Sequence, residues 1–410
     1  MKRRNFLIQS GIFSATAITA ISSNTIVARS ANPNSDQKRL IVIFLRGAVD
    51  GLNVVIPYSE TAYYQARPQI AIPQPGKEGG VIDLDGRFGL HPALAPLMPE
   101  WQKNSLAFVH ACGSPDPTRS HFDAQQYMEN ATPGDKQTQD GWMNRLLGVI
   151  SQKTPIQAVS VGETTPGIFS GRMPVANIAS GKNATRALPI DRTQLAAAFN
   201  QLYGGNDPLS QTYRQGRMAH EAIMKDLDSE MHLANNGAPS SDGFASDAQR
   251  LAQLMLKDSR IELGFMALGG WDTHVNQGNT QGQLARNLKK LGSGLAALIK
   301  GLGNVYQNTT IVVMSEFGRT VKQNDNGGTD HGHGNVIWVL GGKIRGGKVY
   351  GEWPGLSTAQ LYQGRDLAIT TDFRDVISAV LSNHLHLNEA KLNQVLPNYT
   401  STSKVVLIVK

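Results

Sequence analysis

The sequence predicts an α/β fold with three layers, in which a mainly parallel central sheet lies between two layers of helices. Two observations support this prediction. Apolar runs of strand length recur along the 410 residues without the alternation of a half-exposed strand, and helical patterns lie between them. The chain is also 40% hydrophobic and has one cysteine, so a large core rather than disulfides must stabilise it.

The predicted elements alternate in chain order. Buried strands are expected where runs are rich in Val, Ile and Phe, at 40–45, 106–110, 158–161, 261–268, 309–314 and 335–340. Helices are expected at 93–102, 121–130, 141–151, 192–201, 209–234, 246–256, 282–302 and 372–385. Ligands of such folds gather at the carboxyl ends of the parallel strands, so the residues that follow each strand are the candidates for function.

The first thirty residues are expected to be an export signal rather than part of the fold. Three basic residues at 2–4 precede a weakly apolar run at 12–26 and small residues at 28–30, which resembles a twin-arginine signal. The run is too short and polar to span a bilayer, which needs about 20 apolar residues. We therefore expect export through the twin-arginine translocation machinery to the periplasm or the exterior, and no stable membrane span in the mature chain.

Residues 31–410 are predicted to form one domain. The segment 176–257 is rich in Gln, Asn, Ala and Ser, and we interpret it as a helical insert or a cap over the substrate. The first thirty residues hold four basic side chains and no acidic one, so the net charge of +7 falls by four to +3 in the mature chain. Without a basic stripe or a recognised reader motif, no nucleic acid partner is expected.

The densest group of potential ligands is the segment GGTDHGHGNV, which contains Asp330, His331 and His333. Imidazole and carboxylate together suit Zn, Mn or Fe, and the neighbouring glycines let the backbone approach an ion closely. A polar loop whose histidines meet only solvent would have the same composition. The sequence here favours neither interpretation by itself.

Carboxylates and one more histidine follow three other predicted strands. Asp50 follows the first strand, and Asp272 and His274 follow the fourth. Residues at i and i+2 of an extended chain project to one face, so the latter two could reach one ion; alternatively, Asp272 caps a turn and His274 is solvated. Glu316, after the fifth strand, must leave the core, hold a metal, or pair with Arg319.

A hydroxyl group stands at the predicted start of the helix 121–130. Ser120 is first of all an N-cap, but amides at a helix N-terminus favour an anion, so its hydroxyl could attack a phosphate or sulfate. Arg119 could clamp the anionic oxygens, and His121 could bind metal or transfer a proton. Thr118 and Ser114 are rival hydroxyls.

A series of longer motifs carries a family resemblance. In order they are RGAVDGLNVVIPY, HPALAPL, DPTRSHFDAQQYME, GWMNRLL, GGWDTH, SEFGRT, GTDHGHGN, VLGGKIRGGKVYG and TDFRDV. They resemble the domain of unknown function 1501 family over nearly the whole mature chain. That family is often exported by twin-arginine signals and is grouped with the alkaline phosphatase and sulfatase superfamily. The resemblance therefore implies an alkaline phosphatase-like fold with a two-metal site on a parallel sheet.

The resemblance also implies roles for single residues. Ser120 or Thr118 would be the nucleophile. The metal ligands would be Asp50 after the first strand, Asp272 with His274 as the pair on one ion, and Glu316 as the later carboxylate. His331 would be the late histidine, with Asp330 and His333 as additional or alternative ligands. The chain departs from the superfamily where Glu316 is followed by Phe317 instead of His, and the 272–274 spacing is short. The site can therefore hold fewer metals, or a different one.

Two functions remain open from the sequence. The first is an exported metal-dependent hydrolase of anionic esters, phosphate before sulfate, which uses a hydroxyl nucleophile and one or two divalent ions (Zn, Mn, Fe or Ca). A formylglycine sulfatase is not expected, because Pro115 stands where that signature needs an oxidisable Cys or Ser. The second is a non-catalytic exported metal-containing protein for binding or assembly, with an acidic polysaccharide as one partner.

Overall fold

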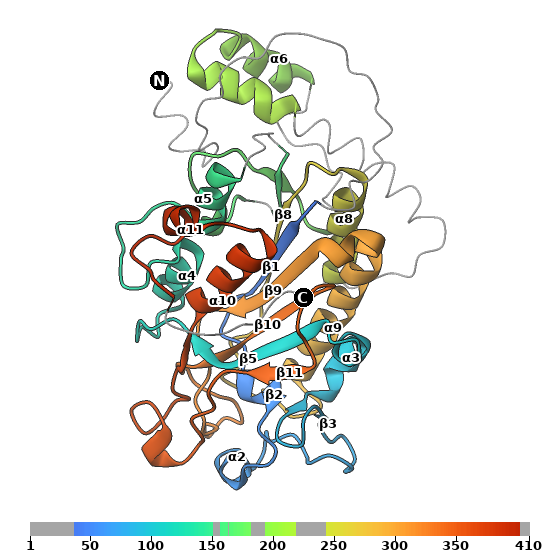
Figure 1. Cartoon of the computed structure of the whole chain (residues 1–410), viewed down its shortest axis with the longest axis vertical. Helices are drawn as coiled ribbons and strands as arrows, with labels where there is room; N and C mark the ends of the chain where they lie inside the picture. The colour runs from blue at the N-terminus through green and yellow to red at the C-terminus, as the bar shows by residue number, and fades with distance from the viewer. Residues whose placement is uncertain (1–36, 151–155, 163, 182–192, 219–242, 402–410) are drawn as a thin grey trace.

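A nine-stranded sheet runs through the centre of the computed structural model, with helices on both faces (Figure 1). The structure describes residues 37–150, 156–162, 164–181, 193–218 and 243–401. The predicted export signal lies outside these residues. The strand order is β11-β5-β10-β9-β1-β8-β6-β7, and β12 pairs with β5.

The strands coincide closely with the predicted runs. The central sheet consists of β1 (Arg39–Leu45), β5 (Leu106–Gly113), β6 (Ala158–Val161), β7 (Ala176–Ile178), β8 (Leu263–Leu268), β9 (Thr309–Ser315), β10 (Asn335–Gly341), β11 (Lys348–Tyr350) and β12 (Thr371–Asp372). A small second sheet has the order β2 (Val55–Ile56), β4 (Gly89–Leu90) and β3 (Ile82–Asp83). All six predicted strands are present, and each differs from its prediction by a few residues at most.

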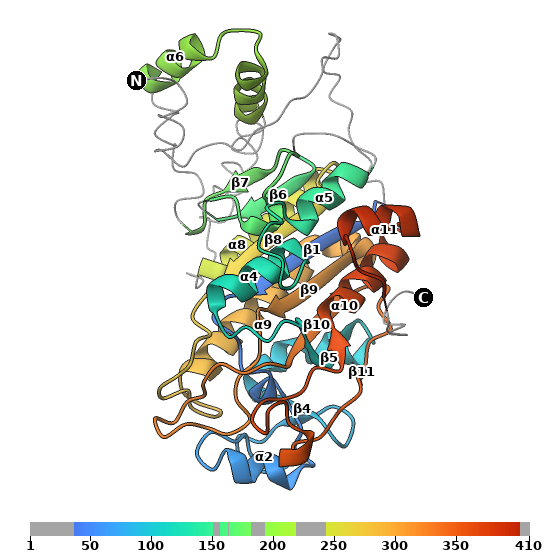
Figure 2. The ribbon, with the colours of Figure 1, turned by 90° about the vertical axis from the view of Figure 1, so that its left-hand side faces the viewer.

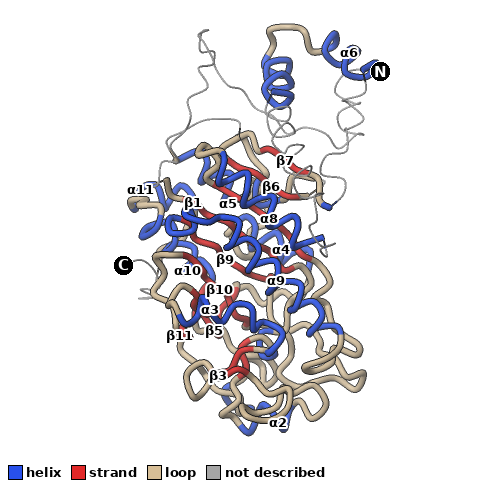
Figure 3. The backbone as a smooth tube through the Cα atoms, turned by 90° about the vertical axis from the view of Figure 1, so that its right-hand side faces the viewer, coloured by secondary structure: helices blue, strands red, loops and turns tan. Residues whose placement is uncertain are grey.

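Helices lie on both faces of the central sheet and beyond its ends (Figure 2). They are α2 (Thr61–Ala66), α3 (Met98–Gln102), α4 (His121–Asn130), α5 (Trp142–Val149), α6 (Thr193–Leu202), α8 (Gly243–Lys257), α9 (Gln283–Leu302), α10 (Phe373–Ala379) and α11 (Glu389–Val395). Figure 2 shows α4, α5, α10 and α11 over one face of the sheet, and Figure 3 shows α8 and α9 over the other. The predicted helix 93–102 divides into a 3₁₀ helix, Pro92–Leu97, and α3, since Pro96 and Pro99 have no N–H to donate.

Strand β1 explains why its sequence shows no alternation. All seven of its residues are buried. Ile41, Ile43 and Leu45 belong to the core cluster shared with α8 and α9, whereas Val42 and Phe44 belong to the cluster on the opposite face, with α5 and α10. A strand covered on both sides needs apolar residues at every position. The three-layer α/β/α fold with a mainly parallel sheet is therefore confirmed.

The direction of β10 determines where the segment before it lies. β10 runs antiparallel to both of its neighbours, β5 and β9, while β1 pairs in parallel with β8 and β9. In register, Asn335 at the start of β10 faces Cys112 near the end of β5. The loop that precedes β10 therefore reaches the same rim as the carboxyl ends of the parallel strands.

The predicted insert at 176–257 is narrower in the structure. Its first residues form β7 in the central sheet, and its last residues form α8, whose Leu251 and Met255 belong to the core. Between them the structure describes α6, which lies beyond the β7 edge (Figure 2), and a helical stretch at 208–218. Residues 182–192 and 219–242, which include most of the predicted helix 209–234, lie outside the described residues. A cap over the substrate stays a prediction.

No helix within the described ranges is both long enough and apolar enough to cross a membrane.

His110 gives the fold a pH dependence that can be measured. It lies in β5 with 2% of its surface exposed, its Nε2 bonds the carbonyl of Val55, and burial lowers its pKa from 6.5 to about 4. Between these pH values the unfolded chain binds a proton at His110 that the folded chain does not bind. The contribution of neutral His110 to the free energy of unfolding is therefore complete above pH 6.5 and is lost as the pH falls toward 4. Between pH 7 and pH 5 we expect a loss of about 2 kcal/mol from this residue.

Urea unfolding of EDTA-treated protein at the two pH values measures this loss. The matched variant is His110→Gln, whose free energy of unfolding should fall by less over the same interval. Treatment with EDTA removes any contribution from metal release. An equal fall in both proteins would show that His110 is not the source.

Candidate metal centre

Three imidazoles and one carboxylate meet at the rim of the sheet. The Nε2 atom of His331 lies 2.9 Å from Nε2 of His121 and 3.0 Å from Nε2 of His274. The carboxylate of Asp272 contacts the Nε2 atoms of His274, His331 and His121 at 2.9, 3.3 and 3.4 Å respectively. We call these four residues the His/Asp cluster. Sequence positions far apart therefore supply one compact set of nitrogen and oxygen ligands.

The cluster is built by elements whose ends share the rim. His121 is the first residue of α4, directly after its N-cap Ser120. Asp272 and His274 follow β8, and His331 precedes β10. The bridge between Arg319 and His331 holds the loop that links β9 to β10 against itself. The start of α4, the end of β8 and the bridge at His331 thus bring the four side chains together.

Each of the three imidazoles is bonded on its outer side to an acceptor. The pairs are Nδ1 of His121 with Oε1 of Glu316 at 2.8 Å, Nδ1 of His274 with Oδ1 of Asp330 at 3.0 Å, and Nδ1 of His331 with the carbonyl oxygen of Arg119 at 2.9 Å. An acceptor at Nδ1 keeps the proton on that nitrogen of a neutral imidazole. The lone pair is then on Nε2, which faces the cluster.

This arrangement of lone pairs fits a bound cation. Three Nε2 atoms and a carboxylate at these distances repel one another unless they share positive charge. Histidines that bind metals almost always donate their other N–H to a carboxylate or carbonyl, as all three do here. Nitrogen and carboxylate ligands in a set of four are typical of Zn²⁺, whereas Ca²⁺ takes six to eight oxygens.

The pKa values of two cluster histidines shift in opposite directions. The hydrogen bond with Glu316 raises the pKa of His121. Burial, together with the charge of His121, lowers the pKa of its neighbour His331. The two rings therefore accept one positive charge between them more readily than two.

Arg319 supports Asp272. Its guanidinium is buried, and Nη1 donates to Oδ1 of Asp272 at 2.5 Å. Burial alone would raise the pKa of Asp272, but the hydrogen bond and charge of Arg319 hold that pKa below its ordinary value. Asp272 is therefore an anion at neutral pH, as a metal ligand must be. The sequence suggested Arg319 as a partner of Glu316; the bond to Asp272 is the one the structure contains.

Glu316 is committed to orienting His121. The carboxylate is 1% exposed, and its Oε1 accepts hydrogen bonds from Nδ1 of His121, from the Gly47 amide at 2.9 Å and from Nε2 of Gln125 at 2.9 Å. Burial would raise its pKa, but these bonds hold it below its ordinary value. Glu316 therefore acts on the cluster through His121 rather than by contact with its centre.

The predicted ligands thus separate into three groups. Asp272, His274 and His331 lie in the His/Asp cluster, and Glu316 and Asp330 are one bond further out. The remaining two have other partners in the described part of the chain. Asp50 is fully buried and bonded to Arg67 and Gln277, and His333 stacks on Tyr362 with ring centroids 4.3 Å apart.

The predicted hydroxyl and arginine lie beside the cluster. Ser120 is exposed, and its Oγ accepts from the amide of Asp123 at 3.4 Å, as an N-cap does. Its own amide donates to Oγ1 of Thr118 at 3.2 Å. The guanidinium of Arg119 bonds Asp366 at 2.6 Å and Gln363 at 2.9 Å, so it is already paired. The carbonyl of Arg119, and not its charge, contacts the cluster.

The sequence interpretation included His121 but missed Gln125 and Arg67. His121 was expected to act as a metal ligand or a proton carrier, and the structure places it among the ligand atoms. Gln125 was not singled out. Its spacing of four residues from His121 was the available signal, because positions i and i+4 of a helix share one face. Arg67 gave no signal at all, since an arginine directly after a short helix is ordinary in sequence.

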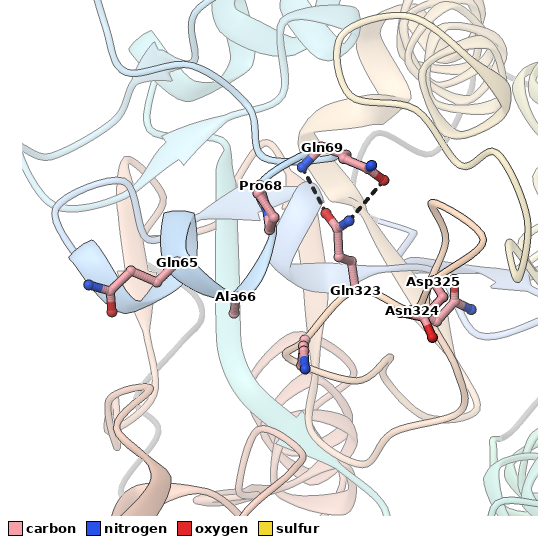
Figure 4. Close-up of a pocket in the computed structure, with 8 residues that line it drawn as sticks. Gln65, Ala66, Pro68, Gln69, Gln323, Asn324 and Asp325 are labelled. Carbon is pink, nitrogen blue, oxygen red and sulfur yellow. Dashed lines mark hydrogen bonds between the residues drawn. The ribbon is translucent and has the colours of Figure 1, made fainter.

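A pocket of about 260 Å³ lies near the loop between β9 and β10 (Figure 4). Its lining comes from the end of α2 and from residues 322–325, and the side chains of Gln69 and Gln323 bond one another across it at 3.0 Å. Asn324, in the same lining, donates to Oδ1 of Asp330 at 3.1 Å. One residue of the lining therefore contacts Asp330, whose carboxylate orients His274.

Comparison with known proteins gives one family match. The family model described as "Protein of unknown function (DUF1501)" matches residues 37–396. No curated protein matches the chain.

Solved structures give weaker likenesses. Among them are a protein in the alkaline phosphatase superfamily from Vibrio parahaemolyticus (10% identity, 77% of this chain and 63% of that chain, TM-score 0.36), the C-terminal periplasmic domain of EcEptC from Escherichia coli in complex with Zn (11%, 92% and 94%, 0.39), and the alkaline phosphatase from the Antarctic bacterium TAB5 (12%, 74% and 92%, 0.30). The chain thus spans less than two thirds of the Vibrio protein.

Proposed function

Because the chain belongs to the DUF1501 family of proteins of unknown function, we propose its function from the site itself: a metal-dependent hydrolase of phosphate esters, with sulfate esters as the second substrate class. One observation carries this proposal. Three Nε2 atoms and the Asp272 carboxylate converge, and every Nδ1 is bonded to an acceptor outside the cluster. Such an arrangement supports a resident divalent cation.

The His/Asp cluster would hold this cation through His121, His274, His331 and Asp272. The donor set favours Zn²⁺, and Ca²⁺ is the least suited of the ions expected from the sequence. When bound, the ion supplies Lewis acidity that polarises the ester and lowers the pKa of a hydroxyl nearby. Glu316, Asp330 and Arg319 fix the positions of the ligands around it.

Ser120 is the proposed nucleophile. Its hydroxyl is exposed, directly precedes a cluster histidine in the chain, and caps a ten-residue helix. The amides and dipole at that helix end favour the negative charge of the ester and of the attacking oxygen. Thr118 is the alternative hydroxyl. Arg119 contributes its carbonyl to His331, and its paired guanidinium is not assigned to the substrate.

Export belongs to the proposal on the strength of the sequence alone. The basic residues at 2–4 and the weakly apolar run after them support passage through the twin-arginine machinery to the periplasm or the exterior. This route suits a protein that binds its metal before crossing the membrane.

Replacing Ser120 by asparagine tests the nucleophile. Asparagine caps a helix about as well as serine but has no hydroxyl, so α4 and the metal content should be retained. Turnover of p-nitrophenyl phosphate should fall by at least about 1,000-fold, as expected when a nucleophile is removed. Thr118→Val is the matched control and should retain turnover.

Elemental analysis and assays on aryl phosphates, phosphodiesters and sulfates provide the measurements. Unchanged turnover in Ser120→Asn would reject this residue as the nucleophile. A wild-type protein that contains metal but hydrolyses no ester would reject the enzyme, and would favour a non-catalytic binding or assembly protein instead.

A further inference from the structure

We infer that the centre takes a single divalent ion, and that the buried Asp50–Arg67 pair serves as a support for the ligand Asp272 instead of binding a second ion. This inference rests on the metal centre of the proposed function. It concerns two carboxylates, Asp50 and Glu316, that the sequence assigned to metal binding.

Asp50 already has a cation as its partner. Its oxygens accept from Nη1 and Nη2 of Arg67 at 2.6 and 3.0 Å, and both side chains are fully buried. The remaining donor positions of Arg67 bond Asn53 and the carbonyls of Thr320 and Val321. An arginine with all its donors used cannot turn away to admit an ion without leaving several buried groups unpaired.

Glu316 is equally committed. Its Oε1 accepts from His121, Gly47 and Gln125, and its Oε2 lies 3.0 Å from the hydroxyl of Ser315. A second ion on Oε1 of Glu316 would have to displace three donors, including the one that orients His121. Asp50 and Oε1 of Glu316 are therefore both occupied by donors of the protein itself.

The Asp50–Arg67 pair connects to the cluster through buried hydrogen bonds. Nε2 of Gln277 donates to Asp50 at 2.7 Å, and Oε1 of Gln277 accepts from the hydroxyl of Thr329 at 2.9 Å. That hydroxyl in turn accepts from Nε of Arg319 at 3.1 Å, and Arg319 donates to Asp272. We call this series, Asp50–Gln277–Thr329–Arg319–Asp272, the relay.

The relay has one consistent direction of donation. Gln277 can offer its carbonyl to Thr329 only while its amide nitrogen faces Asp50, and Thr329 then has a lone pair for Arg319. Asp50, Gln277 and Thr329 are each 0% exposed, so no solvent competes for these bonds. Asp50 thereby contributes to the orientation of Arg319, whose Nη2 also donates to the carbonyl of Thr329 and whose Nη1 holds one oxygen of Asp272. It is a positioning residue for the metal ligand.

Titration of the metal-free full-length protein with Co²⁺ tests both parts of the inference. We expect one equivalent per chain to produce the visible absorption of the bound ion, and further Co²⁺ to add none. Two equivalents with the same affinity would overturn the single-ion assignment. A wild-type protein that binds no Co²⁺ would overturn it as well.

The relay is tested with Gln277→Met, which removes the bonds of Gln277 to Asp50, Thr329 and Thr273 and leaves the hydrogen bonds between Asp50 and Arg67 in place. The variant should still bind one equivalent, with its Kd raised about 10-fold and its visible spectrum altered, as expected when an outer partner of a ligand is lost. Gln323→Met is the matched control, since Gln323 bonds Gln69 outside the relay. Wild-type affinity and spectrum in Gln277→Met would overturn the positioning role.

These outcomes are separate from those of the hydrolase. One equivalent of Co²⁺ without turnover of any ester would reject the proposed reaction and leave the single-ion centre standing. Two equivalents of Co²⁺ together with turnover of an ester would reject the single-ion centre and leave the proposed reaction standing.

Discussion

Replacing His331 by alanine is expected to release the metal ion and to lower phosphate ester hydrolysis by more than about 100-fold. The Nε2 of His331 is the nitrogen that contacts both other histidines of the cluster, so its loss removes the atom that all the others face. Loss of an outer partner already costs 10- to 100-fold in metal affinity or activity, so loss of a ligand should cost more than about 100-fold. Elemental analysis after dialysis, together with initial rates, measures both effects.

The neighbouring histidine provides the control. His333 is two residues further along and stacks on Tyr362, and burial lowers its pKa. His333→Ala should therefore retain the ion and most of the turnover. If His331→Ala kept its metal, or if His333→Ala lost it, the ligand assignment would be wrong.

Replacing Arg67 by methionine is expected to destabilise the fold by about 3–5 kcal/mol, because it leaves the carboxylate of Asp50 buried without its cation. The guanidinium is fully buried and joins the α2 region to Asp50 and to the loop after β9. Chemical denaturation at neutral pH measures the change. The circular dichroism of the native state should stay the same at low denaturant.

A second change should recover part of this loss. In the double variant Asp50→Asn with Arg67→Met no unpaired charge remains buried, so its free energy of unfolding should exceed that of Arg67→Met. A single variant as stable as the wild type would contradict the argument. A double variant that is less stable than Arg67→Met would contradict the argument as well.

The sequence was sufficient for most of the fold. Strands covered on both faces are continuous apolar runs, and this signal located β1, β5, β8 and β9 to within a few residues. It did not contain the direction of β10, because a central antiparallel strand covered on both faces has the same composition as a parallel one. The pairing of β10 with β5 and β9 depends on contacts between distant parts of the chain.

The candidate site was only partly predictable. The positions of Asp272 and His274 after β8 were enough to bring these two residues to the rim. His331 reaches the same rim because β10 is antiparallel to its neighbours, which the sequence did not show. Spacing in the sequence could not distinguish a carboxylate that faces the centre of the cluster from one that orients a histidine of the cluster. Asp272 is of the first kind, and Glu316 and Asp330 are of the second. The bond between Asp50 and Arg67 spans 17 residues and crosses from one element to another, so no local pattern announced it.

The wide separation of the ligands in the sequence has a consequence for the unfolded chain. His121 and His331 are 210 residues apart, and His274 and His331 are 57 apart. An ion held by all of them closes two long loops of the polypeptide, and it binds the folded state in preference to the unfolded one. In a chain whose one cysteine, Cys112, is buried and free, such an ion would constrain the fold as a covalent cross-link does.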